Sequence, residues 1–148
     1  MYILSIETTG KYGSVALIDS DGNITSKNSN EEMNHLKDIM FLADECLKAK
    51  GVDSTSIDAV AASIGPGSFT GIRIGVSTAR GIAEMLNIPC ISISSLEGMA
   101  ALADAHVREE VRLFAPIINA RRGQLYGALF ERSGAGYEAV LSEKRSEE

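Results

Sequence analysis

The stretch SIGPGSFTGIRIGVSTARG, residues 63–81, decides the fold because it passes from a buried strand through a glycine-rich turn into a helix. The apolar run at 56–65 predicts the strand. The small and apolar residues at 71–86 predict the helix that follows the turn. A strand, a tight turn and a helix form the repeating element of an α/β sheet, so we expect an α/β protein.

The hydrophobic pattern on both sides of this stretch extends the same alternation. The first thirty residues predict an antiparallel meander with a turn at Asp21-Gly22, and Asn34 is expected to cap the first helix. The alternation predicts a sheet covered by helices on both faces, and strands that restart near residue 110 predict a second unit. We therefore divide the chain into residues 1–108 and an incomplete unit at 109–148. The expected elements are three strands within 1–30, helices at 34–50, 71–86 and 94–106, strands at 56–65 and 87–94, and strands from 111 onward.

Composition narrows the class of protein. The 148 residues carry 20 acidic and 14 basic side chains, a net charge of -6 that argues against unaided binding of nucleic acid. No apolar run approaches the ~20 residues of a membrane span, and the first residues lack the features of a signal peptide. We expect a cytoplasmic protein. Cys46 and Cys90, each among apolar neighbours, are expected to be buried free thiols.

The glycine turn resembles an anion site without matching any nucleotide motif. Backbone N–H groups converge where a helix begins, and the hydroxyls near them add donors. The lysine of a phosphate-binding loop and the last glycine of a dinucleotide fingerprint are both missing. A turn that needs positive φ at a glycine is the alternative interpretation. The residues of the possible anion-binding loop are Gly65, Gly67, Ser68 and Thr70.

The helix at 71–86 carries more apolar surface than one sheet face requires. Gly71, Gly75, Ala79 and Ala83 form one ridge of small residues, and the apolar arc is about twice as wide as one sheet face needs. The surplus predicts either internal packing against the first helix or contact with a second molecule, and we favour the second molecule. The residues expected near the centre of that contact are Phe41, Ile72, Gly75, Val76 and Ala79.

Groups that could act in catalysis are few. Glu7 ends the first strand, where it could serve as an acid or base, or accept N–H bonds from the next turn. His35 and His106 lack a second histidine at ligand spacing, so we expect neither a catalytic residue nor a metal site. Arg121-Arg122 fits an anion-binding point and a solvated hairpin turn equally well.

Four stretches together resemble one family, TsaB (YeaZ), the bacterial partner subunit in making threonylcarbamoyladenosine on tRNA. They are YILSIETT…GSVALID, GPGSFTGIRIGVSTARGIA, SISSLEGMA and INARRGQLYGALF, in this order. The resemblance implies an actin/Hsp70-like (ASKHA), ribonuclease H-like fold. It also implies a subunit without catalytic activity or cofactor, because the transferase TsaD carries two metal-binding histidines where this chain has Ser95 and Met99.

The same resemblance implies partners. Members pair through their first two helices, as homodimers when alone or productively with TsaD, and the ATPase TsaE joins the pair. Contact with tRNA is expected only through that complex, and none with a membrane. The chain departs from the family pattern in three ways. Position 7 is Glu where many members have Asp, and the family's DARRGEVY reads NARRGQLY here. The chain also ends at Glu148, short of the family's usual length. The alternative function is a metallopeptidase-like or ATP-binding enzyme of the same superfamily.

Overall fold

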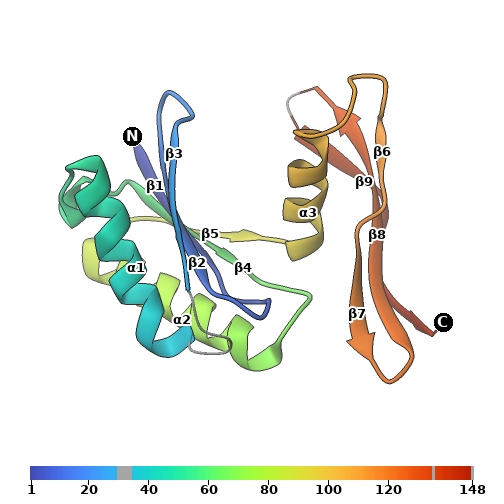
Figure 1. The fold of residues 1–148 in the computed structure, drawn as a ribbon, viewed down its shortest axis with the longest axis horizontal. Coiled ribbons are helices and arrows are strands. Elements are labelled where there is room, and N and C mark those ends of the chain that lie inside the picture. Colours follow the sequence, from blue (N-terminus) through green and yellow to red (C-terminus); the bar gives the residue numbers. More distant parts are fainter. Residues whose placement is uncertain (30–34, 135, 148) are drawn as a thin grey trace. The chain divides into compact units, whose positions relative to one another are not determined.

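The computed structural model describes residues 1–29, 35–134 and 136–147, and it divides the chain into two compact units. The first unit comprises Met1–Ile64 and Ser68–Ile93. The second comprises Gly65–Gly67 and Ser94–Glu148. The predicted order of strands and helices is confirmed (Figure 1). Each unit is built around a sheet of its own.

The first unit contains a five-stranded mixed sheet in the order β3-β2-β1-β4-β5. The first three strands form the predicted antiparallel meander, and β4 and β5 lie parallel to β1 and to each other in turn. A parallel strand requires a crossover, and the helices supply it. The strands are β1 (Tyr2–Glu7), β2 (Ser14–Asp19), β3 (Ile24–Asn28), β4 (Ala59–Ser63) and β5 (Cys90–Ile93).

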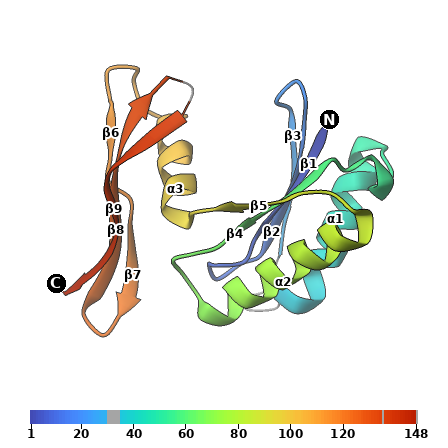
Figure 2. The same ribbon diagram turned by 180° about the vertical axis from the view of Figure 1, so that it is seen from behind.

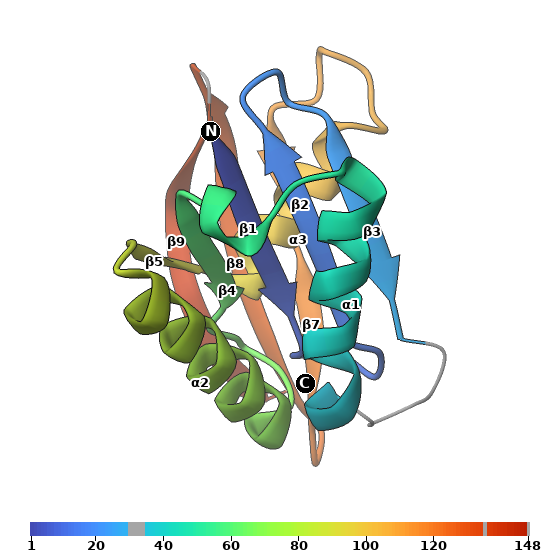
Figure 3. The ribbon, with the colours of Figure 1, turned by 90° about the vertical axis from the view of Figure 1, so that its left-hand side faces the viewer.

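Both helices of this unit pack on the same face of the sheet (Figure 3). Helix α1 (His35–Lys50) contacts β2 and β3, whereas α2 (Phe69–Leu86) contacts β4 and β1. A short 3-10 helix, η1 (Ser54–Ser56), precedes β4. Asn34, the predicted cap of the first helix, lies outside the described residues.

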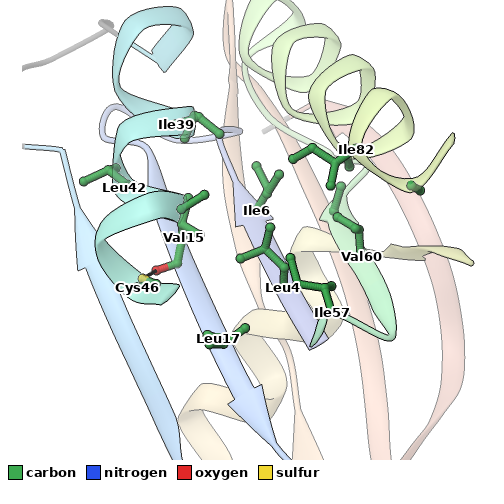
Figure 4. Packing of buried hydrophobic residues seen from close by; sticks show 14 residues of the cluster. Leu4, Ile6, Val15, Leu17, Ile39, Leu42, Cys46, Ile57, Val60 and Ile82 are labelled. Atoms are coloured by element: carbon green, nitrogen blue, oxygen red, sulfur yellow. Dashed lines mark hydrogen bonds between the residues drawn. The ribbon is translucent and has the colours of Figure 1, made fainter. Parts of the chain in front are cut away.

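Buried and partly exposed side chains alternate along the strands of the first sheet, so only the face toward α1 and α2 is fully packed. In β1, Leu4 and Ile6 are each 1% exposed and face the helices, while Ile3 and Ser5 point to the opposite face. The expectation of helices on both faces is wrong for the first unit, since its two described helices, α1 and α2, pack on the same face of its sheet. The core residues labelled in Figure 4 are Leu4, Ile6, Val15, Leu17, Ile39, Leu42, Cys46, Ile57, Val60 and Ile82.

The second unit packs one helix on an antiparallel sheet. Helix α3 (Ser95–Asp104) lies against this sheet (Figure 2). It buries Leu96 and Ala100 against Phe114 and Phe130 of the sheet. The predicted boundary at residue 108 therefore moves to Ser94, because the apolar face of α3 packs on the second sheet. The strands are β6 (Leu113–Phe114), β7 (Ile117–Arg121), β8 (Gln124–Ser133) and β9 (Gly136–Glu147), with β8 paired to the other three.

A polar cluster ties the end of α3 to this sheet. Asp104 forms an ion pair with Arg132 of β8 and accepts a 2.7 Å hydrogen bond from the Tyr137 hydroxyl of β9. Tyr137 also meets the Phe114 ring edge-on, with 5.8 Å between ring centroids. These contacts join the helix to two neighbouring strands.

The β2–β3 turn gives a prediction about pH. Asp19 accepts hydrogen bonds from the Lys50 ammonium at 2.7 Å and from the Asn23 backbone at 2.9 Å, which hold the pKa of its carboxyl far below the usual range. A carboxyl with a lowered folded pKa adds stability above its unfolded pKa, about pH 4, and loses it as the pH falls toward the folded value. We expect Asp19→Asn to flatten the fall in urea midpoint between pH 5 and pH 2.

The matched control is Asp53→Asn, because the Asp53 side chain makes no capping bond to η1. This variant keeps the contact between Asp19 and Lys50, so it should retain the fall in urea midpoint between pH 5 and pH 2. An Asp19→Asn profile with the native slope would show that the Lys50 contact adds no pH-dependent stability.

Candidate functional site

The glycine turn between β4 and α2 is held by hydrogen bonds to other residues of the chain. Gly65 has φ of +101°, which confirms the predicted need for a glycine there. The Ser68 hydroxyl accepts a hydrogen bond from the Gly71 N–H at 3.2 Å, and the Ser68 N–H donates to the Thr9 carbonyl at 2.8 Å. Ser68 is thus the N-cap of α2. Of the four predicted anion-binding residues, Gly65 and Gly67 belong to the second unit and Ser68 and Thr70 to the first, so anion binding there stays a prediction.

The ridge of small residues on α2 faces β1. The Thr8 hydroxyl donates to the Gly71 carbonyl at 2.7 Å. A Cβ atom at Gly71 would lie 1.9 Å from the Thr8 carbonyl oxygen, and one at Gly75 would lie 2.2 Å from the Thr8 hydroxyl oxygen. Ala79 is fully buried at 0% exposure. The structure therefore corrects the expectation that Gly75 and Ala79 contact a partner, because these small residues let α2 approach its own sheet.

Two further predicted residues lie on the flank of α2 that faces β5. Val76 lines a pocket of about 250 Å³ together with Ile64 of the β4 end and Cys90 and Ile91 of β5. Ile72 precedes Val76 by one helical turn, so it shares that flank, and both side chains are half-buried. Ile72 and Val76 therefore lie on the side of α2 next to the edge strand β5, and their contact with a partner stays a prediction.

The opposite flank of α2 faces α1 and is open. Five side chains line a shallow hollow of about 320 Å³ there, and they are Thr70, Arg73, Ile74, Ser77 and Thr78. This flank faces α1 because α1 lies over β2 and β3, on the other side of α2 from β5. Figure 3 shows the two helices side by side.

Helix α1, the neighbour of α2, presents two large exposed apolar side chains. Phe41 is 62% exposed and Met40 is 53% exposed, whereas Ile39 and Leu42 are buried in the core. Asp38 accepts a hydrogen bond from the Ser29 hydroxyl just after β3, and Met40, two residues later, lies on a different flank of α1 from Asp38. We call Met40, Phe41, Thr70, Ile74, Ser77 and Thr78 the outer helix face.

The sequence analysis named Phe41 for the predicted contact but did not name Met40 or Ile74. The projection of a helix at 100° per residue gives its flanks but not which flank the neighbouring helix occupies. The strand order β3-β2-β1-β4-β5 supplies that information, because it places α1 and β5 on opposite sides of α2.

The groups considered for catalysis have structural partners. Glu7 accepts the Thr9 N–H at 2.5 Å and also binds the Ser63 hydroxyl, which ties the end of β1 to the following turn and to β4. The Nδ1 atom of His106 lies 2.8 Å from the Leu102 carbonyl at the end of α3. The side chain of His35 lies outside the described part of the chain. Among the described residues, no three histidine, cysteine, aspartate or glutamate side chains gather as metal ligands.

The two cysteines differ from each other. Cys46 is buried in the core, and burial raises the pKa of its thiol. Cys90 is free but exposed, contrary to prediction, because β5 is the edge strand and all four of its residues are exposed. None of the helices in the described ranges is both long and apolar enough to span a bilayer.

Comparison with known proteins now gives the family. The profile of TsaD, tRNA N6-adenosine threonylcarbamoyltransferase, matches residues 27–145. The tRNA threonylcarbamoyladenosine biosynthesis protein TsaB of Bacillus subtilis is 33% identical over 97% of this chain and 61% of its own length. The protein of the same name from Haemophilus influenzae is 37% identical over 84% of this chain and 51% of its own length. The chain belongs to the TsaB/YeaZ branch of the TsaD family.

The solved structures agree with this assignment to TsaB/YeaZ. YeaZ from Pseudomonas aeruginosa superimposes with a TM-score of 0.87 and 27% identity, over 97% of this chain and 66% of that chain. The predicted actin-like ASKHA fold is thereby confirmed, and an activator of 2-hydroxyisocaproyl-CoA dehydratase from Clostridium difficile shares the fold alone, with a TM-score of 0.56 and 14% identity. This TsaB-family chain spans about half to two thirds of the length of these relatives.

Proposed function

We propose that this chain is a non-catalytic subunit in threonylcarbamoyladenosine modification of tRNA, and that it pairs with a TsaD-type transferase. The observation that carries the proposal is the outer helix face, because α1 leaves Phe41 and Met40 more than half exposed and the neighbouring helix α2 carries an open hollow. Large exposed apolar side chains gathered in one place mark a protein-binding surface. The occupant is a TsaD-type paralogue, because the chain belongs to a branch of that family whose relatives are named for this modification.

The first turn of α3 supports the absence of catalysis. Ser95 and Met99 occupy the positions that the family resemblance assigns to the two metal-binding histidines of TsaD. Ser95 is only 8% exposed, and its N–H donates to the Gly65 carbonyl at 2.8 Å. A serine packed in this way and a methionine offer poor ligands for a hard divalent metal. Transfer of the threonylcarbamoyl group then belongs to the paralogue, with a TsaE-type ATPase as a further member of the complex.

Reconstitution of the modification tests this function. The chain is combined with the TsaD-type and TsaE-type proteins of its own genome, and threonylcarbamoyladenosine is measured in tRNA supplied with the threonylcarbamoyl donor. We expect no product from this chain alone and product only when it joins the other two proteins. Product from the chain alone, or an equal rate without it, would overturn the proposal.

A further inference from the structure

Strand β5 lies at one edge of the first sheet, so one of its two sides has no strand beside it within the described ranges. The Pro89 carbonyl accepts a hydrogen bond from the Val60 N–H of β4 at 3.0 Å, and the Ile93 carbonyl accepts one at 2.9 Å from the residue after β4. Backbone groups point to alternate sides along an extended strand. Cys90 and Ser92 therefore direct their N–H and C=O groups to the free side of β5.

This free side lacks the features that usually protect an edge strand. Charged side chains, bulges and prolines keep other strands away from most sheet edges. Strand β3 at the opposite edge carries Lys27, whereas β5 reads CISI and pairs with β4 without a register shift. Pro89 precedes β5, but its carbonyl faces β4, so this proline does not block the free side. All the residues of β5 are exposed, which leaves the edge open to an added strand.

The pocket of about 250 Å³ between β5 and α2 adjoins this edge. Its apolar walls come from Ile64, Val76 and Ile91, and every residue that lines it belongs to the first unit. Cys90 and Ser92 also line it, because they pair with residues of β4 whose side chains face the helices. Alternate side chains of a strand added to β5 would point to this same face. One apolar side chain of the added strand can therefore enter the pocket.

Arg80 gives this pocket a positive charge. Its exposed side chain lines the pocket and forms no ion pair with another described residue. The residues of β5 carry no charge, so the β5 strand of a second copy would bring no acidic group to Arg80. Charge complementarity instead favours an extended segment that contains an acidic residue.

We propose that the free edge of β5 binds an extended peptide segment of a partner protein by strand addition. Backbone hydrogen bonds to Cys90 and Ser92 hold a peptide of any sequence, and the pocket selects an apolar side chain. An aspartate or glutamate at the next position on the same face of the peptide would pair with Arg80. This edge lies on the opposite flank of α2 from the outer helix face, so its occupation is independent of the proposed pairing with a TsaD-type protein.

Selection from a library of random short peptides displayed on phage tests this site. The native 148-residue chain is the bait, and the enriched peptides are synthesised and titrated against the purified chain. Cys90 provides a second readout, because its thiol is exposed whereas that of Cys46 is buried. Peptide at about ten times its dissociation constant should slow alkylation of the Cys90 thiol by about tenfold, because about a tenth of the chain then stays free.

Two substitutions separate the backbone contacts from the charge. Ser92→Pro removes an N–H that faces the free side, where an edge strand tolerates proline. Its matched control is Ser26→Pro, which removes an N–H from the free side of β3 at the opposite edge. Arg80→Glu reverses the charge of the pocket and, at an exposed position, keeps the test informative if the proline variant unfolds. Its matched control is Arg73→Glu, an exposed arginine on the other flank of α2.

We expect Ser92→Pro to weaken binding of the selected peptides on the order of tenfold, because a backbone hydrogen bond is lost. Arg80→Glu should weaken it by at least about threefold, and both controls should bind as the native chain does. Three results would overturn the proposal: no enriched peptide, enriched peptides that bind both variants as tightly as the native chain, or peptides that leave Cys90 alkylation unchanged. Self-association that Ser92→Pro abolishes would also contradict it, since the edge would then belong to a second copy.

Discussion

Gly71→Ala should destabilise the first unit by about 3 kcal/mol or more, because the new Cβ atom has no room. It would lie 1.9 Å from the carbonyl oxygen of Thr8 and 3.0 Å from its carbonyl carbon. Backbone atoms cannot swing aside as the end of a side chain can, so α2 must move away from β1. That movement breaks the bond between the Thr8 hydroxyl and the Gly71 carbonyl. Urea unfolding followed by circular dichroism measures the loss.

The same helix offers a matched control for this substitution. Gly81 is exposed, and an added Cβ atom there meets nothing within 4 Å. Gly81→Ala should raise the free energy of unfolding by roughly 1 kcal/mol, because alanine is the better helix former. If both variants unfolded near the urea midpoint of the native chain, α2 would not depend on its close approach to Thr8.

The second large effect concerns pairing. Phe41→Asp combined with Ile74→Asp should weaken binding to the TsaD-type protein by roughly a hundredfold or more, because it replaces apolar contact with two charges that pairing would bury. Phe41 is mostly exposed and Ile74 is half-buried, so the fold should tolerate the change better than a core substitution. Titration of the immobilised TsaD-type protein with native and variant chain gives the ratio of dissociation constants.

A charge-matched control separates this surface from the rest of the chain. Ile24 on β3 and Val140 on β9 are 65% and 51% exposed, and neither belongs to the outer helix face. Ile24→Asp with Val140→Asp should bind almost as tightly as the native chain. Equal weakening by both pairs of substitutions would argue that net charge, and not the outer helix face, controls pairing.

The order of elements could be predicted from the sequence because it depends on local patterns. Alternating apolar residues indicate the strands, and the glycine turn predicts positive φ at Gly65 or Gly67, of which Gly65 adopts it. The location of partner contacts could not be predicted in the same way. Gly75 and Ala79 looked suited to an intermolecular contact because small residues permit any close approach, and only the structure shows that Thr8 occupies the space.

Non-local packing explains the other differences. The apolar residues of α3 are compatible with either sheet, so the boundary at Ser94 emerged only from contacts with Phe114 and Phe130. Cys90 lies in an apolar segment whose exposure follows from the edge position of β5, a property of strand order rather than of sequence. Arg121-Arg122 fitted a hairpin turn and an anion-binding point equally well, and the structure shows the hairpin turn, with Arg122 and Gly123 as its two loop residues.

The mass of this chain mixed with the TsaD-type protein of its own genome tests the pairing account most directly. Light scattering during size-exclusion chromatography should show a complex with one copy of each protein, formed at the expense of any species that this chain makes alone. Two unshifted peaks at micromolar concentrations of both proteins would contradict the account, since the exposed phenylalanine and methionine of the first helix would then have no such partner to cover them.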